Sequence, residues 1–372
     1  MMIMAKNDRG SSARFALLIT QKERTMLTPK QNFLETLKKD GHPDRLVNNY
    51  EYGAFLPGDP IEYYIRGSYY QGMEPKKDAF GTELIWPEDS VAVMPHVTEE
   101  NQVIPDLEEW QDYLKVPEIA KEVSGDEVWG PFRERIAAVP RDEYLLMPFM
   151  HTGLFERMHF LMGFEDLFCS FYEDPEDLAD LFQRIADYRF EVFKTLIDHT
   201  HPDLILSHDD WGTKQQLFMQ PDLWREFIKP HYEKLYSYCH DEGIIIVHHS
   251  DSFLEPIIED LIDIHADVWQ GVLPQNNIDQ LLEIADGRIT LQGGLEMGIC
   301  DRPDTTEEEV RQNTREVCEK WGPKGHFIPS ITYGGPGTLF PQNYGYVWDE
   351  IAKYNHEVYG TEYPYPYTQY VG

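Results

Sequence analysis

Cysteine is scarce in this sequence, and its spacing carries no motif. The four cysteines (Cys169, Cys239, Cys300 and Cys318) are scattered over 372 residues without a CxxC pair. In a chain of this length the pattern is typical of reduced cytosolic thiols and not of a disulfide framework. We therefore expect a fold that is stabilised by a large hydrophobic core.

Basic residues are also few. The chain has 32 Lys and Arg against 66 Asp and Glu, which gives a formal net charge of −34. Such a surface repels the phosphates of nucleic acids and anionic membranes, so neither is expected as a partner. A polyanionic substrate would need a local basic pocket.

Long hydrophobic runs are absent as well. No apolar stretch approaches the length of a membrane span, and residues 15–19 are too short for the core of a signal peptide. We expect a cytoplasmic protein. A helix opens at residues 28–29, so residues 1–26 form an N-terminal extension that need not be ordered, or reflect a misassigned start. Residues 27–372 are expected to form one catalytic domain.

From residue 144 onward, strand and helix patterns alternate regularly. This alternation predicts a parallel sheet, and the length with about eight strands favours a (β/α)8 TIM-type barrel. No GxGxxG turn follows a strand, which argues against a dinucleotide-binding fold. Residues 53–143 are irregular and rich in aromatic residues, and we expect them to decorate the barrel. The predicted strands are 144–150, 204–207, 244–249, 268–272, 289–293 and 327–332, and the main predicted helices are 28–39, 174–196, 221–242, 254–265, 278–285 and 306–320.

Polar residues follow the most apolar strands directly. Residues 244–247 lead into His248, His249, Ser250 and Asp251, and residues 204–206 lead through Ser207 into His208, Asp209 and Asp210. In a barrel the carboxyl ends of the strands form the active site, so these groups are expected to form two walls of one site. His151, Gln270, residues 292–296 and residues 332–335 complete the expected rim.

Two kinds of chemistry fit these groups. Nitrogen and oxygen ligands from several strands suit zinc, and the same groups could perform acid–base catalysis without a metal. Each residue taken alone also has a structural explanation. A histidine at a strand end is often a hydrogen-bonded structural residue, and Asp commonly caps the helix that follows. Adjacent histidines point to opposite faces of a strand, so at most one of His248 and His249 easily faces the barrel axis.

Several segments together resemble the uroporphyrinogen decarboxylase superfamily. They are residues 161–167 with 172–175, residues 210–212 through 220–224 to 229–232, residues 291–295, and residues 325–329 through 340–343. The resemblance covers most of residues 27–355. It implies a TIM-type barrel that is often dimeric, so a homodimer is an open option.

The decarboxylase branch of this superfamily carries an Arg-Gln-Ala-Gly-Arg segment after the first strand. The corresponding stretch here, residues 47–52, reads Val-Asn-Asn-Tyr-Glu-Tyr and contains no arginine. Because the carboxylates of a tetrapyrrole need cationic partners, true uroporphyrinogen decarboxylation is not expected.

The other branch comprises corrinoid-dependent methyltransferases with a zinc-binding His-x-Cys motif. Here His248-His249-Ser250 has serine at the cysteine position, and residues 332–333 lack the second cysteine. The chain resembles more closely the anaerobic O-demethylases, which take methyl groups from methoxylated aromatics. That resemblance implies a methyl donor of small size, a corrinoid supplied by a partner protein, and a zinc ion that acts as a Lewis acid.

The resulting hypothesis assigns roles to eleven residues. The predicted metal ligands are His248, Asp251 and Glu296. The predicted catalytic residues are His208, Asp209, Asp210 and His249. The predicted substrate-binding residues are Tyr50, Tyr52, Trp211 and Tyr333, although core packing explains these aromatics about as well.

Two alternatives stay open. One is a metal-free lyase of the same superfamily that uses Asp209 or Asp210 with His248 for proton transfer. The other is a non-catalytic barrel that binds a corrinoid or tetrapyrrole. The second is the weaker, because a carrier does not need so many titratable groups at the strand ends.

Overall fold

The computed structural model describes residues 26–88, 93–300, 302, 304–332 and 341–361. Of the expected extension over residues 1–26, residues 1–25 lie outside these ranges, and so does the predicted substrate residue Tyr333. Among the described residues, no helix combines the length and the apolar character that crossing a membrane requires.

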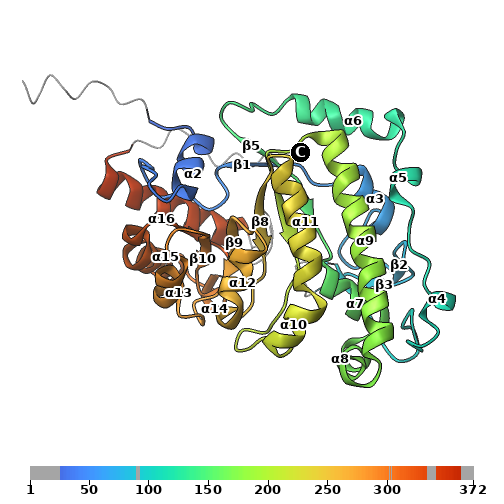
Figure 1. The fold of residues 1–372 in the computed structure, drawn as a ribbon. Coiled ribbons are helices and arrows are strands. Elements are labelled where there is room, and N and C mark those ends of the chain that lie inside the picture. The colour runs from blue at the N-terminus through green and yellow to red at the C-terminus, as the bar shows by residue number, and fades with distance from the viewer. Residues whose placement is uncertain (1–25, 89–92, 301, 303, 333–340, 362–372) are drawn as a thin grey trace, which may run out of the picture.

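Parallel strands form the centre of the molecule (Figure 1). Two of them, β1 and β5, pair with each other, and the rest form one sheet in the order β11-β10-β9-β8-β7-β6. Only Pro148 separates β5 from β6, and because proline has no N–H group it interrupts the ladder there. The strands are β1 (Gly53–Phe55), β5 (Leu145–Met147), β6 (Phe149–Met150), β7 (Leu204–His208), β8 (Ile245–His249), β9 (Val268–Val272), β10 (Thr290–Gly294) and β11 (Phe327–Ser330).

Side chains bridge the seam between the last strands and the segment before β1. In the described residues no backbone ladder joins β11 to β1. Instead, the Tyr52 hydroxyl donates to Gln292 Oε1 at 2.8 Å, and the Ser330 hydroxyl bonds to the Asn49 side chain. The strands therefore make a barrel that is held together at this seam by buried polar contacts.

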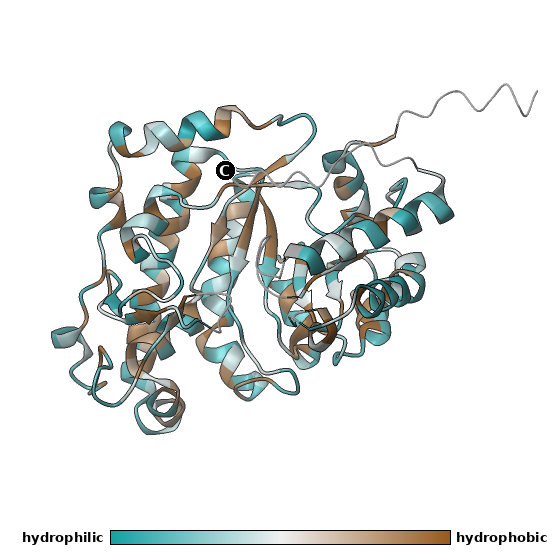
Figure 2. Cartoon of the chain, turned by 180° about the vertical axis from the view of Figure 1, so that it is seen from behind, coloured by the Kyte–Doolittle hydropathy of each residue, from teal (hydrophilic) through white to brown (hydrophobic). Residues whose placement is uncertain are grey.

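Helices cover the outside of the barrel (Figure 1). Figure 2 shows hydrophobic residues concentrated on the strands and hydrophilic residues on the outer helix surfaces. This amphipathic pattern buries one face of each helix against the strands. The helices are α2 (Pro29–Leu37), α7 (Leu154–Met162), α8 (Phe164–Glu173), α9 (Pro175–Thr200), α10 (Pro221–Phe227), α11 (Lys229–Asp241), α12 (Ile258–Asp263), α13 (Ile278–Ala285), α14 (Met297–Cys300), α15 (Glu307–Trp321) and α16 (Pro341–Tyr359), with 3-10 turns η1 (Glu255–Ile257) and η2 (Gly322–Lys324).

The predicted helix 221–242 is wrong as a single element. The chain forms α10 and α11, and the break falls at Ile228. Pro230 follows closely, and a proline there removes a backbone donor and disfavours a continuous helix. The break turns α10 outward at the same end of the molecule as the carboxyl ends of the strands (Figure 1).

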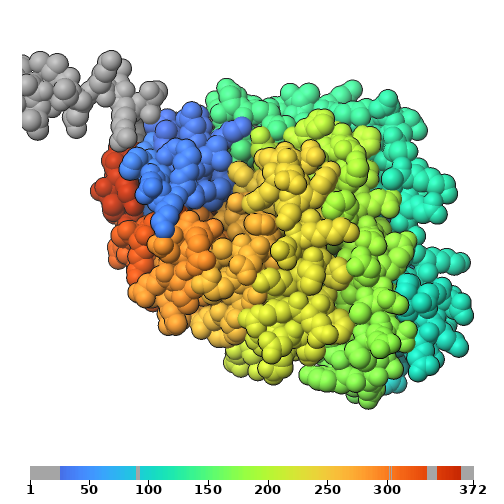
Figure 3. All heavy atoms as spheres, viewed as in Figure 1, coloured from blue at the N-terminus to red at the C-terminus, as the bar shows by residue number. Residues whose placement is uncertain are grey.

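The irregular region lies along one side of the barrel, as its aromatic-rich sequence led us to expect. In Figure 3 the cyan to green part of this region, about residues 90 to 140, forms the right-hand and upper edge of the molecule. The Arg157 guanidinium contacts the Asp78 carboxylate at 2.7 Å and ties this region to α7. Its elements are α3 (Pro60–Arg66), the antiparallel strands β2 (Lys76–Lys77), β3 (Glu83–Ile85) and β4 (Met94–Pro95), and helices α4 (Trp110–Tyr113), α5 (Ile119–Glu122) and α6 (Asp126–Ala137).

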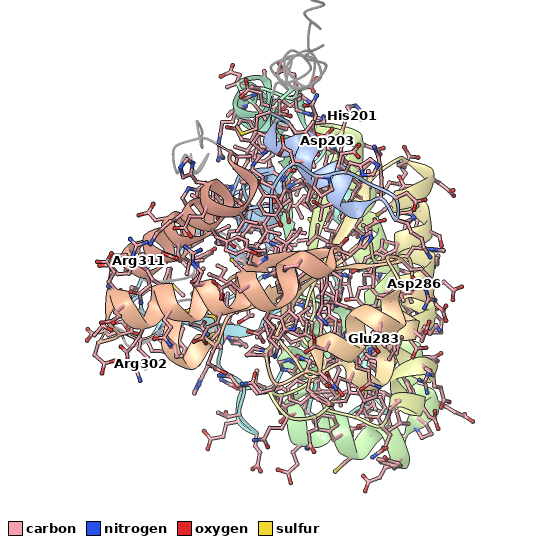
Figure 4. All side chains as sticks on the ribbon, turned by 90° about the vertical axis from the view of Figure 1, so that its left-hand side faces the viewer. His201, Asp203, Glu283, Asp286, Arg302 and Arg311 are labelled. Atoms are coloured by element: carbon pink, nitrogen blue, oxygen red, sulfur yellow. The ribbon has the colours of Figure 1, made fainter. Side chains whose placement is uncertain are left out.

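The amino ends of the strands are fixed by structural ion pairs. Asp203, just before β7, accepts a hydrogen bond from the Leu146 N–H at 2.8 Å and contacts Arg141 at 2.8 Å. Figure 4 shows Asp203 beside His201 at one end of the molecule, away from Arg302. At this end of a barrel such contacts serve stability, so the chemistry is sought at the opposite ends of the strands.

Candidate metal centre

Two histidines meet at the carboxyl ends of β7 and β8. The parallel register places His208 opposite His249, and their rings stack with centroids 4.5 Å apart and planes 23° apart. Neighbouring residues of a strand point to opposite faces, so His248 turns the other way. Of the two adjacent histidines, it is His249 that joins His208.

Asp210, in the loop after β7, completes a cluster with these histidines. One ligand atom from each of His208, Asp210 and His249 lies within 4.8 Å of the others. Asp210 Oδ2 is 3.9 Å from His208 Nε2, while its Oδ1 accepts the Asp251 N–H at 3.0 Å. Two imidazoles and a carboxylate form a donor set that suits zinc.

Second partners orient both rings. Nδ1 of His208 is 2.9 Å from Glu156 Oε2, and Nδ1 of His249 bonds to the Gln270 side chain. Metal-binding histidines almost always use one ring nitrogen in this way, which fixes the tautomer and leaves the other nitrogen for the metal. The residues therefore fit a zinc ion bound through the two Nε2 atoms and Asp210.

Replacing Glu156 by alanine is expected to weaken zinc binding about 10- to 100-fold, because His208 loses the partner that orients its ring. Competition with a chelating dye measures the affinity, and thermal unfolding verifies that the variant is folded. The control is Glu165→Ala, which removes an exposed acid from the first turn of α8. Equal zinc affinity in both variants would contradict this role of Glu156.

Charge is unevenly shared within the cluster. Burial disfavours the charged form of His208, but Glu156 and Asp210 outweigh burial and raise its pKa to about 10. Burial, followed by the charge of Asp210, raises the pKa of Asp251 to about 8. Burial also lowers the pKa of His249 to about 3. Acidic groups thus crowd a buried site, where a divalent cation would balance their charge.

Asp209 has a different environment from its neighbour Asp210. Its fully buried carboxylate accepts the N–H groups of Phe155 and Glu156, each at 3.0 Å. It also accepts the indole N–H of Trp211 at 2.8 Å and the hydroxyl of Tyr232 at 2.7 Å. These four donors occupy the carboxylate, so Asp209 caps α7 and positions Glu156. We therefore replace its predicted catalytic role by a positioning role.

Gly153 makes this cap possible. A Cβ atom on Gly153 would lie 2.0 Å from Cγ of Asp209, which is far inside contact distance. Gly153→Ala is therefore expected to destabilise the fold by about 1–3 kcal/mol, the usual cost of overpacking. Urea unfolding measures this difference. The control Gly345→Ala lies inside α16, and its new Cβ meets nothing within 4 Å beyond its chain neighbours and the backbone of its own helix, so it should not destabilise.

His248 and Glu296, two of the predicted ligands, lie apart from the cluster. His248 is fully buried; its ring stacks on Trp211 at 4.2 Å, and its Nδ1 contacts the Tyr236 hydroxyl at 2.8 Å. Glu296 accepts a hydrogen bond from Gln275 at 2.8 Å on the rim. The third predicted ligand, Asp251, touches the cluster through its backbone bond to Asp210.

The predicted substrate aromatics are core residues in the described structure. Tyr50, Tyr52 and Trp211 are buried, and the Tyr52 ring stacks on Phe33 with a centroid distance of 3.7 Å. Trp211 packs between His248 and the helix layer. Packing in the core therefore accounts for the presence of these three aromatic residues, and no contact with a substrate is needed to explain them.

A small pocket lies near the cluster of His208, Asp210 and His249, between α3, the end of β6 and α9. Phe149 lines it and places its ring 5.8 Å from that of His208. His151, expected at the rim, also lines it, and its Nε2 is 3.3 Å from Glu62 Oε1. The residues of α3 show no helical periodicity in the sequence, so its pocket residues were not predicted. The lining includes Asp59, Ile61, Glu62, Ile65, Arg66, Phe149, His151, Tyr188 and Arg189.

Residues 76–354 match the model of the uroporphyrinogen decarboxylase (URO-D) family. The chain belongs to this family. A solved methyltransferase from Methanosarcina mazei is similar in structure, with a TM-score of 0.59 at 15% identity over 88% of this chain and 99% of that one. No curated protein is similar enough in sequence to match. The URO-D family match and the similar methyltransferase structure confirm the predicted TIM-type barrel. Because the methyltransferase is only 15% identical, its similarity shows the fold alone.

Proposed function

We propose that this protein transfers a methyl group from a small O-methylated compound, favouring methoxylated aromatics, to Co(I) of a separate corrinoid protein. The observation that carries this proposal is the cluster of His208, Asp210 and His249, in which both rings have a second partner on Nδ1. The URO-D family and the shared fold with a methyltransferase support the same reaction class.

The donor set favours an ether over a thiol as the substrate. Ser250 occupies the position where a thiolate ligand would stand, and the cluster contains only nitrogen and oxygen donors. Zinc with such donors, when bound, would act as a Lewis acid that stabilises the negative charge developing on the ether oxygen. A thiolate-rich site would leave the metal less electrophilic.

In this proposal, some residues of the chain bind the metal and others orient the metal-binding side chains. His208, Asp210 and His249 would hold the metal, while Glu156 and Gln270 fix the two rings. Asp209 fixes Glu156 through the first turn of α7. His249 is buried and His208 and Asp210 are half-buried, so electrostatic interactions within the cluster are stronger than they would be in bulk water.

The methyl acceptor must reach the site from outside. The carboxyl ends of the strands are the open end of such a barrel, and the corrinoid protein is proposed to dock there. The net charge of −34 does not oppose this contact, because docking depends on local complementarity.

A Co(I) corrinoid assay tests the proposal. Zinc-loaded protein is mixed under anaerobic conditions with reduced cobalamin and a panel of methoxylated aromatics, methylated amines, methylated thiols and methanol. The expected result is loss of the Co(I) absorption with one demethylated phenol formed for each methylcobalamin. Methylation from a thiol alone, or from no compound, would contradict it.

The metal-free lyase is less well supported by the described geometry. Asp209 already accepts four hydrogen bonds, and His248 is buried among Trp211 and Tyr236. Neither is placed to exchange a proton with a substrate. Release of carbon dioxide by metal-stripped protein would nevertheless establish that reaction and overturn ours.

A further inference from the structure

Arg189 of α9 joins two segments on which the metal centre depends. Its side chain is buried, and its Nη1 donates to the carbonyl oxygen of Thr152 at 2.7 Å, in the turn between β6 and α7. Its Nη2 donates to the Ser207 hydroxyl at 2.9 Å and to the carbonyl oxygen of His208 at 3.4 Å, at the end of β7. One planar guanidinium therefore fixes the start of α7 against the strand that carries a proposed metal ligand.

The contact with Thr152 controls the direction of the next N–H group. The peptide between Thr152 and Gly153 is a planar trans unit, so its C=O and its N–H point to opposite sides. Its C=O accepts from Arg189, and its N–H donates to Glu156 Oε2 at 2.7 Å. The same oxygen of Glu156 is 2.9 Å from Nδ1 of His208. A rotation of this peptide would remove the N–H group from the carboxylate that orients the metal-binding ring.

Backbone strain in the turn explains why the peptide needs such a contact. Thr152 has a φ of 55°, in the left-handed region that a β-branched residue rarely adopts. Conformations of this kind persist only where the surrounding structure holds them. The rings of Phe193 and Tyr232 lie 5.1 and 5.7 Å from Cζ of Arg189, so the cation that holds the turn is itself held by packing. The turn should therefore relax when the guanidinium is removed.

We propose that Arg189 is a positioning residue of the zinc site, which acts on His208 through the Thr152–Gly153 peptide and Glu156. The inference rests on the metal centre of the proposed function and adds to it a residue that touches neither metal nor substrate. Position and charge have opposite effects here. Orienting Glu156 strengthens zinc binding, whereas a buried positive charge nearby repels a divalent cation and weakens it.

Competition with a chelating dye measures the zinc affinity of three single variants. Arg189→Met removes the charge and the donors from a side chain of similar length. Arg189→Lys keeps the charge but lacks the planar fork that reaches both segments. Arg315→Met is the matched control, because it loses the same charge from a contact between α15 and α16, where Arg315 pairs with Glu350 at 2.6 Å. Thermal unfolding verifies that each variant is folded at the temperature of the measurement.

We expect Arg189→Met to bind zinc about 10- to 100-fold more weakly than the wild type, the usual effect of losing an outer partner of a metal ligand. Arg189→Lys should lose about three- to tenfold, and Arg315→Met should keep the wild-type affinity. Because Arg189→Lys keeps the buried charge, it decides the question if Arg189→Met does not fold. Unchanged or tighter zinc binding in either variant of Arg189, or an equal loss in Arg315→Met, would overturn the inference.

A double variant tests the route through Glu156. If Arg189 acts by holding Glu156, then Arg189→Lys/Glu156→Ala should bind zinc about as weakly as Glu156→Ala alone. Losses that multiply would mean that Arg189 supports the fold in general, and they would overturn the inference.

These measurements need no turnover, so the inference and the proposed function fail separately. Wild-type protein that binds no zinc would overturn both. The expected zinc affinities without methyl transfer to Co(I) would support the role of Arg189 and overturn the proposed reaction alone.

Discussion

Replacing His249 by alanine is expected to remove the bound metal and to abolish methyl transfer. His249 supplies one of two imidazoles in a three-residue donor set, so its loss leaves a single ring and a carboxylate. We expect about one zinc ion per chain in the wild type and only a small fraction of that in the variant. Because Lewis-acid stabilisation is worth several kcal/mol, the rate should fall by about a thousandfold or more.

The neighbouring histidine provides a matched control. His248→Ala removes the same side chain from the adjacent position, but from the face that packs on Trp211. It should retain zinc while it loses stability through the cavity that it leaves. Elemental analysis of both purified variants measures the metal. Loss of zinc in His248→Ala together with its retention in His249→Ala would contradict the site and restore the ligand predicted from the sequence.

Asp209→Ala is expected to have the largest effect on stability. It removes one buried carboxylate and leaves four buried donors without an acceptor: two N–H groups of α7, the indole of Trp211 and the hydroxyl of Tyr232. Removing one partner from a buried network of this kind costs about 3–5 kcal/mol. Glu156 should move as well, because its N–H is one of the four donors.

Urea unfolding compares this variant with Asp222→Ala, which removes an exposed acid whose contact is Arg225 at 3.1 Å. The control should change the free energy of unfolding by less than about 1 kcal/mol. If Asp209→Ala were as stable as the control but inactive, Asp209 would have the catalytic role that the sequence first suggested.

The sequence located the strand ends correctly but left the direction of their side chains undecided. Residues 204–206 and 244–247 are apolar on both faces, so their pattern carries no alternation that separates inside from outside. His248 and His249 are therefore equivalent until the register with β7 and the packing of Trp211 are known. The same holds for Asp209 and Asp210.

The pocket could not be predicted for a different reason. Tyr50 and Tyr52 carry the residue type of a substrate site, yet core packing uses the same residues, and the structure buries them. Glu62 and Arg66 lie on α3, which has seven residues in a region without periodicity. Their relation to His151 and Phe149 arises only when α3 packs against the end of β6.

The limits of the domain, with its extension over residues 1–26, stay a prediction.

Zinc-edge X-ray absorption spectroscopy of the wild-type protein tests the central claim most directly, because it reports which atoms bind the metal. The account predicts zinc with two imidazole nitrogens at about 2.0–2.1 Å, carboxylate oxygen at about 2.0–2.2 Å and no sulfur. Scattering from sulfur at about 2.3 Å, or a protein that retains no metal after growth with zinc, would contradict it.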